Sequence, residues 1–135
     1  MLAVTKMRKY ASSAVSTFKS SRKVARQHLR RIHARANRWR CNARVVAVTG
    51  SSAKSTTVSL LSHILAGHSQ VLTQVLANGL RDATKTLRRL TSNDDYVIME
   101  AGTSGIGQIQ QIARIIRPDV AIVTLVALEH YSAFR

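Results

Sequence analysis

The residues best suited to chemistry lie in a short run of small and hydroxyl-bearing residues around one lysine. The members of this run are Gly50, Ser51, Ser52, Ala53, Lys54, Ser55 and Thr56. A small-residue loop that opens a helix presents backbone N–H groups to an anion, and a lysine adds positive charge. A serine hydroxyl directly after that lysine can coordinate Mg²⁺. The run therefore predicts a site for nucleotide phosphates, with Lys54 on the phosphates and Ser55 on the metal.

Three further polar residues, Asn78, Glu100 and His130, each follow an apolar run. Ligands of parallel sheets bind beyond the carboxyl ends of the strands, so we expect these three residues to converge with Lys54 on one edge. Glu100 could hold Mg²⁺ directly or through water, and His130 could be a second metal ligand or orient a phosphate. Asn78 fits an ordinary Asn-Gly turn equally well.

Apolar runs and helical patterns alternate four times after residue 44. Strands are expected at 45–48, 71–76, 96–99 and 120–126, and helices after Lys54, at 80–90 and at 108–116. The strand runs are continuously apolar, which is typical of strands buried on both faces. The pattern predicts an α/β fold with a P-loop-like parallel sheet flanked by helices.

The charge divides the 135-residue chain in two. The whole chain has a formal net charge of +15 at pH 7. Residues 1–44 hold 13 of its 21 Lys and Arg and none of its six acidic residues. We therefore expect a basic helical arm at 1–44 and a nearly neutral domain at 45–135. Cys41 is the only cysteine, which excludes an intrachain disulfide and favours a reducing, cytoplasmic setting.

The arm shows helical periodicity, with an apolar stripe that includes Ala25, Leu29, Ile32 and Ala36. Ser20-Ser21 suggests a break between two helical pieces. Three roles stay open: a helix packed on its own domain or on further sequence, peripheral contact with an anionic membrane surface, and nucleic-acid binding or targeting. Because the arm has few aromatic residues for base stacking, nucleic acid is the least favoured partner.

Two stretches resemble the Mur ligase family. VTGSSAKSTT is similar to its nucleotide loop, T-G-x-x-G-K-[ST]-T-T, and residues 96–130 are similar to its next segment, from a strand ending in Glu to a His. The cadence E-x-G-T-x-x-x-G-x-I looks most like the branch that adds D-alanyl-D-alanine to the muramoyl tripeptide. The resemblance covers residues 45–135 and implies the first half of a central ATPase domain.

The resemblance implies an ATP-dependent acid–amino-acid ligase of peptidoglycan biosynthesis. ATP phosphorylates a carboxylate in such enzymes, and an amine attacks the acyl phosphate to give an amide, ADP and phosphate. By position, Lys54 matches the phosphate-binding lysine, and Asn78 matches the asparagine of a turn near the γ-phosphate. The implied Mg²⁺ ligands are Ser55, Glu100 and His130. We expect the segment to be truncated and not competent alone.

The sequence departs from the family pattern at three positions: Ala53 and Ala77 replace glycines, and Leu125 replaces an asparagine. If residue 53 needs a positive φ, its Cβ costs about 1–2 kcal/mol. Two alternatives remain open. One is a non-catalytic nucleotide- or phosphate-binding module tethered by its arm to a membrane surface or partner, and the other is a fragment without activity.

Overall fold

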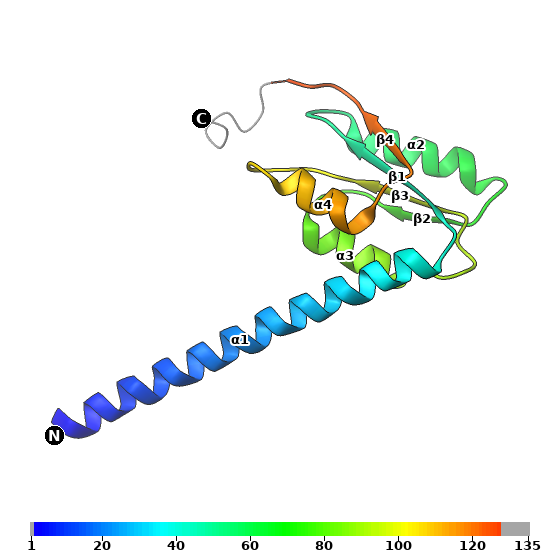
Figure 1. Ribbon diagram of the computed structural model, residues 1–135. Helices are drawn as coiled ribbons and strands as arrows, with labels where there is room; N and C mark the ends of the chain where they lie inside the picture. Colours follow the sequence, from blue (N-terminus) through cyan, green and yellow to red (C-terminus); the bar gives the residue numbers. More distant parts are fainter. Residues whose placement is uncertain (1, 128–135) are drawn as a thin grey trace.

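A four-stranded parallel sheet forms the centre of the molecule (Figure 1). The computed structural model describes residues 2–127, and it describes side chains from residue 20 onward. The strand order is β2-β3-β1-β4. The bounds of the strands are β1 Arg44–Thr49, β2 Val71–Gln74, β3 Tyr96–Glu100 and β4 Val120–Val123. Because the strands are parallel, their carboxyl ends meet at one edge of the sheet.

Helices cover both faces of this sheet. α2 packs on one face, and α3 and α4 pack on the other (Figure 1). The end of α1 lies against α3 and α4. The bounds of the helices are α1 Leu2–Arg40, α2 Lys54–Ala66, α3 Leu80–Arg89 and α4 Gln108–Ile116. The predicted α/β class, with a parallel sheet between helices, is confirmed.

Successive residues of β1 point to opposite faces and are buried on both. Val45 and Ala47 pack in the cluster under α3 and α4, whereas Val46 and Val48 pack in the cluster under α2. A continuously apolar strand is what such a two-sided burial requires. For the central strands the expectation of burial on both faces is therefore correct.

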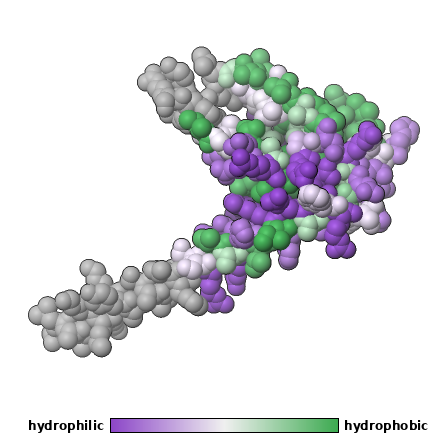
Figure 2. All heavy atoms as spheres, in the orientation of Figure 1, coloured by the Kyte–Doolittle hydropathy of each residue, from purple (hydrophilic) through white to green (hydrophobic). Residues whose placement is uncertain are grey.

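The predicted ends of two strands were wrong. β2 stops at Gln74 because Leu76 adopts a left-handed φ of 60°, and its N–H donates to Glu100 Oε1 at 2.9 Å. β4 ends at Val123 and is an edge strand, with Val123 59% exposed. Hydrophobic residues gather on the α2 and β4 side of the molecule (Figure 2). Burial on both faces therefore does not extend to β4 among the described residues.

The arm is one continuous helix, so the expected break at Ser20-Ser21 was wrong. Serine costs a helix little, and neither glycine nor proline interrupts the sequence between Leu2 and Arg40. Whether 1–44 and 45–135 behave as separate domains stays a prediction. No helix among the described residues combines the length and the apolar character needed to cross a bilayer.

Of the roles left open for the apolar stripe of the arm, packing against its own domain is not what the described residues show. Leu29 and Ile32 are 56% and 48% exposed, whereas Ala34 is completely buried. A small side chain lets α1 approach α3 closely, and Asn37 Nδ2 then lies 3.3–3.4 Å from three carbonyls at the end of α3. The face of α1 that packs is therefore set by Ala34 and Asn37, and the larger apolar residues remain outside.

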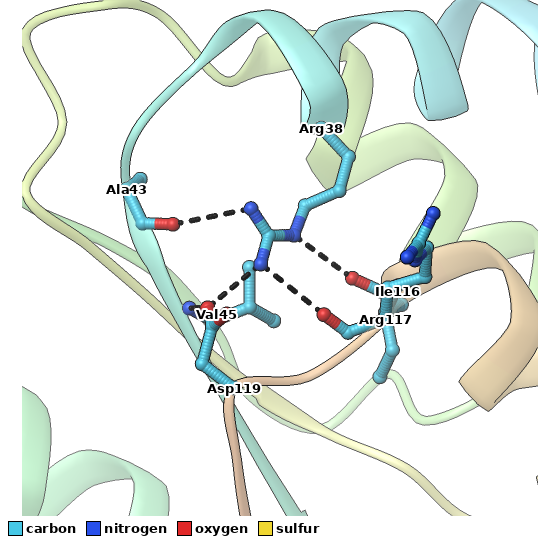
Figure 3. A network of polar contacts seen from close by, with 6 residues as sticks. All are labelled: Arg38, Ala43, Val45, Ile116, Arg117 and Asp119. Carbon is cyan, nitrogen blue, oxygen red and sulfur yellow. Dashed lines mark hydrogen bonds and ion pairs between the residues drawn. The ribbon is translucent and has the colours of Figure 1, made fainter.

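Arg38 fastens the end of α1 to the domain (Figure 3). Its guanidinium donates to the main-chain carbonyls of Ala43, Ile116 and Arg117, and it forms an ion pair with Asp119 at 2.7 Å. Asp119 Oδ2 also accepts the N–H of Val45 at 2.7 Å. One arginine thus joins α1 to the start of β1 and to the turn before β4.

Candidate functional site

The loop between β1 and α2 begins at a glycine that has no room for a side chain. Gly50 has φ 133°, and a Cβ there would lie 2.2 Å from Thr124 Oγ1 and 2.9 Å from the carbonyl oxygen of Leu125. The chain after β4 therefore presses on the loop from one side. Only glycine allows the backbone to pass this point with such a φ.

Ala53 adopts the left-handed conformation at the N-terminus of α2, with φ 61° and ψ 9°. This is the backbone state for which the sequence pattern of the family has glycine, and the condition that we attached to Ala53 is met. The residue does not block the geometry, because the loop still turns into α2 at Lys54. Its Cβ adds a strain of about 1–2 kcal/mol.

The first turn of α2 has the features of an anion site. Thr57 N–H makes the first helical hydrogen bond, to the carbonyl of Ala53 at 3.0 Å. The N–H groups of Lys54, Ser55 and Thr56 donate to no described residue. Three donors that have no acceptor in the described part of the chain, at a helix N-terminus where the helix dipole is positive, suit a phosphate.

The Lys54 side chain folds back over the loop. Its ammonium lies 2.6 Å from the carbonyl oxygen of Gly50 and 3.3 Å from that of Ser51. An ammonium has three donors, so one stays available to a ligand when both carbonyls are satisfied. The lysine therefore holds its charge against the loop that leads into α2.

Sequence reasoning missed the residues after β4 that pin the loop. Thr124 Oγ1 lies 2.6 Å from the carbonyl oxygen of Ser52, and Ser51 N–H donates to the carbonyl of Leu125 at 2.6 Å. The Ser51 hydroxyl donates to the carbonyl of Ala127 at 3.0 Å and accepts its N–H at 2.9 Å. The Ser51 side chain thus joins the loop to the chain after β4. The only signal in the sequence was a threonine following an apolar strand.

Glu100 ends the strand beside β1 and is 2% exposed. It pairs in register with Val48, two residues before Gly50, which places it next to the start of the loop. Its Oε1 accepts the Leu76 N–H, so the buried carboxylate is held in position by the chain after β2. The expectation that Glu100 and the loop share one edge agrees with this register.

Asn78 lies in the same edge, after β2, and its side chain is exposed. Its carbonyl accepts Gly102 N–H at 2.9 Å, and a Cβ on Gly102 would lie 2.5 Å from the Asn78 side-chain amide. Asn78 is therefore packed on the turn that follows Glu100. Because the residue as a whole is exposed, Asn78 is both a turn residue and a polar residue at the edge.

The predicted metal ligands are only partly placed by the structure. Ser55 and Glu100 lie at the carboxyl edge, whereas His130 falls outside the described residues. Among the described residues no three His, Cys, Asp or Glu side chains form a group that could hold a metal ion. A serine hydroxyl and one carboxylate are oxygen ligands of the kind that Mg²⁺ uses together with water and phosphate.

We expect Ala53→Gly to stabilise the protein by about 1 kcal/mol, because glycine relieves the left-handed strain at residue 53. Urea denaturation followed by circular dichroism measures the change. The matched control is Ala66→Gly, which places the same substitution in the last turn of α2 and should destabilise by about 0.5–1 kcal/mol. Equal destabilisation by both substitutions would contradict the strain at residue 53.

Comparison with known proteins relates this loop and sheet to a family. Residues 48–135, more than half of the chain, match the Mur ligase middle domain. The UDP-N-acetylmuramoyl-tripeptide–D-alanyl-D-alanine ligase of Escherichia coli is 35% identical over 94 residues, which are 68% of this chain and 21% of that protein. The Synechocystis enzyme of the same name is 33% identical over 108 residues, which are 79% and 23%. The chain thus spans about a fifth to a quarter of these curated relatives.

Solved structures show the same similarity in three dimensions. MurF from Acinetobacter baumannii aligns with a TM-score of 0.71 and 28% identity, covering 75% of this chain and 23% of that protein. A MurF ligase from Thermotoga maritima in complex with ADP aligns with a TM-score of 0.62 and 27% identity, covering 70% and 22%. The resemblance to the branch that adds D-alanyl-D-alanine is confirmed by these relatives. The chain belongs to the Mur ligase family.

Proposed function

We propose that residues 50–56 bind the phosphates of ATP together with Mg²⁺. The observation that carries this proposal is the first turn of α2, where Lys54, Ser55 and Thr56 offer N–H groups without an acceptor among the described residues. The Lys54 ammonium adds a positive charge at the loop that leads into this turn. The ADP complex of the Thermotoga maritima relative supports a nucleotide as the ligand.

The residues present divide the work of positioning phosphates. The N–H groups of the first turn and Lys54 would stabilise negative charge. Gly50 lets the loop pass the chain after β4 without a side chain. Ser55 and Glu100 would hold Mg²⁺, which when bound supplies further neutralisation of the phosphate oxygens. Asn78 would contact the terminal phosphate, and His130 would complete the metal ligands.

We further infer that this nucleotide site serves an ATP-dependent acid–amino-acid ligase, in which phosphoryl transfer to a carboxylate precedes amide formation. The family and the names of the relatives support this step. The segment supplies the phosphate-binding part of that reaction. ATP-dependent amide formation by a chain extended to the length of the relatives would test the ligase reaction itself.

We expect Lys54→Ala to weaken Mg-ATP binding by about 10- to 150-fold, since a hydrogen bond to a charged group contributes about 1.5–3 kcal/mol. Isothermal titration calorimetry on the 135-residue chain measures the dissociation constant. The control is Arg114→Ala, which removes the same charge from an exposed position on α4. Absence of binding by the wild-type chain at millimolar Mg-ATP would refute the proposal, as would equal binding by Lys54→Ala.

The alternative of a tethered nucleotide-binding module rests on the exposed apolar side of α1. Val24, Leu29 and Ile32 are all exposed on this helix. An exposed apolar stripe on a basic helix can lie in an anionic membrane interface. Co-sedimentation with vesicles containing phosphatidylserine tests this role, and replacing Leu29 and Ile32 with serine should abolish it. The cytoplasmic location stays a prediction.

A further inference from the structure

A basic groove lies between α3 and the part of α1 that precedes its contact with the domain at Ala34. This α1–α3 groove lies between residues 22–31 of α1 and residues 80–88 of α3, and its volume is about 950 Å³. The wall formed by α1 carries five basic residues: Arg22, Lys23, Arg26, Arg30 and Arg31. Hydrophilic residues gather where α1 meets the domain (Figure 2). The groove is thus a second concave surface, built from helices instead of from the loop after β1.

The facing wall has the same charge. α3 contributes Arg81, Lys85 and Arg88, at intervals of four and three residues that place them on one side of the helix. No acidic or aromatic side chain lines the groove among the described residues. Lys23, Arg26 and Arg30 take part in no ion pair with a described side chain. Two positively charged walls therefore face each other without compensation from the lining.

The position of these charges follows from how α1 is attached. Arg26 and Arg30 precede Ala34 and Arg38 at four-residue steps, so all four lie along one side of α1. Ala34 and Arg38 are packed against the domain, whereas the side chains of Arg26 and Arg30 are exposed. The side of α1 that packs on the domain at Ala34 and Arg38 therefore continues toward the N-terminus as one wall of the groove. Its basic residues face α3 across the groove.

We infer that the α1–α3 groove binds a linear chain of phosphate groups, recognised through charged hydrogen bonds to its phosphate oxygens. A ligand between two positive walls must carry anionic groups on opposite sides, as an extended phosphate chain does. Six of the eight basic residues that line the groove are arginines, whose guanidinium groups suit phosphate oxygens in paired hydrogen bonds. The lack of aromatic side chains excludes base stacking by the lining as the basis of recognition.

A membrane surface does not fit the same groove. A flat array of headgroups cannot contact two walls that face each other across a cleft. The exposed Leu29 and Ile32 also lie about 140° and 160° around α1 from Ala34, on the side turned away from α3. The apolar stripe and the groove are therefore distinct surfaces of one helix, and the groove fits an inorganic polyphosphate chain, which needs no aromatic side chain for base stacking.

The test measures binding of the 135-residue chain to two fluorescent probes, an inorganic polyphosphate and an oligothymidylate, by anisotropy at several salt concentrations. The groove variant is Arg26→Ala with Arg30→Ala. The logarithm of the binding constant falls linearly with the logarithm of the salt concentration, and two lost phosphate contacts make this slope shallower by about 1.4. If both proteins bind equally at 1 M salt, the variant should therefore bind about 25-fold more weakly at 0.1 M salt. Alanine favours helix, so α1 should form in this variant, and circular dichroism checks that it does.

The matched control is Arg35→Ala with Arg40→Ala, which removes the same charge from α1 outside the groove. Lys85→Ala with Arg88→Ala tests the opposite wall and should also weaken binding. Repeating the groove substitutions in a Lys54→Ala background removes the contribution of the nucleotide loop, and they should weaken the binding of both probes there as well. Tighter binding of polyphosphate than of oligothymidylate supports the proposal, whereas tighter binding of oligothymidylate would overturn it in favour of a nucleic-acid backbone.

The inference is overturned if neither probe binds, or if the groove and control variants lose affinity equally, because the arm would then act as a diffuse positive charge. Equal affinity for polyglutamate would also overturn it, since any acidic polymer would then suffice. Loss of probe binding in the groove variant with little change in the control supports it.

Discussion

The Gly50→Ala variant should fold poorly and lose Mg-ATP binding, with a loss of stability of about 2–5 kcal/mol. The new Cβ would lie 2.2 Å from Thr124 Oγ1 and 2.9 Å from the Leu125 carbonyl oxygen, so the chain after β4 would have to move. Such overpacking costs about 1–3 kcal/mol, and a side chain at φ 133° adds about 1–2 kcal/mol. Urea denaturation gives the stability change, and calorimetry gives the nucleotide affinity.

The control for this variant is Gly67→Ala, after α2. Gly67 has φ −64° and ψ −20°, and a Cβ there would meet only the Ile64 carbonyl oxygen at 3.6 Å. Alanine is compatible with that conformation and should stabilise by about 0.4–1 kcal/mol. If Gly50→Ala retained wild-type stability and nucleotide affinity, the loop geometry described above would be incorrect.

Arg38→Ala should release the end of α1 from the domain and destabilise the protein by about 2–3 kcal/mol. Only 13% of the Arg38 side chain is exposed, and its loss removes a donor from three main-chain carbonyls and from Asp119, which keeps the Val45 N–H (Figure 3). Partial exposure of Asp119, at 45%, keeps the expected cost below that of breaking a fully buried pair. Denaturation and limited proteolysis of α1 report the change.

Arg40→Ala is the comparison for this prediction, because Arg40 is exposed in the same last turn of α1 and should cost less than 0.5 kcal/mol. A double-mutant cycle with Asp119→Ala isolates the ion pair, and we expect a coupling of about 1 kcal/mol. Arg38→Ala should also weaken binding in the α1–α3 groove. Equal effects of Arg38→Ala and Arg40→Ala would show that Arg38 does not fasten the arm.

The sequence predicted the sheet and its helices because burial on two faces leaves a clear pattern. A strand such as β1 cannot alternate apolar and polar residues, because helices cover both faces of the sheet. The class and approximate position of such strands were therefore predictable. Strand ends were less predictable, because they depend on tertiary contacts. β2 ends before the hydrogen bond from Leu76 N–H to Glu100, and no pattern in the neighbouring sequence predicts this hydrogen bond.

The loop was predictable in residue type and the arm was not. Gly50, Lys54 and Ser55 follow one another at the short spacing that a phosphate-binding loop needs, so they can be found in the sequence. Ala53 adopts the positive φ that a glycine usually supplies at its position. The packing of α1 depends instead on Ala34 and Arg38, which meet α3, α4 and the turn before β4. The apolar stripe did not identify the face that packs, because a close approach between helices needs a small residue such as Ala34.

The central claim is that the unpaired N–H groups at the start of α2 hold a nucleotide's phosphates. A titration of the ¹⁵N-labelled chain with Mg-ATP, followed by NMR of the backbone amides, tests it most directly. We predict that the amide signals of Lys54, Ser55 and Thr56 shift most and saturate together. Shifts confined to Arg26, Arg30 and Lys85, with an unchanged first turn of α2, would place the nucleotide in the α1–α3 groove and contradict the claim.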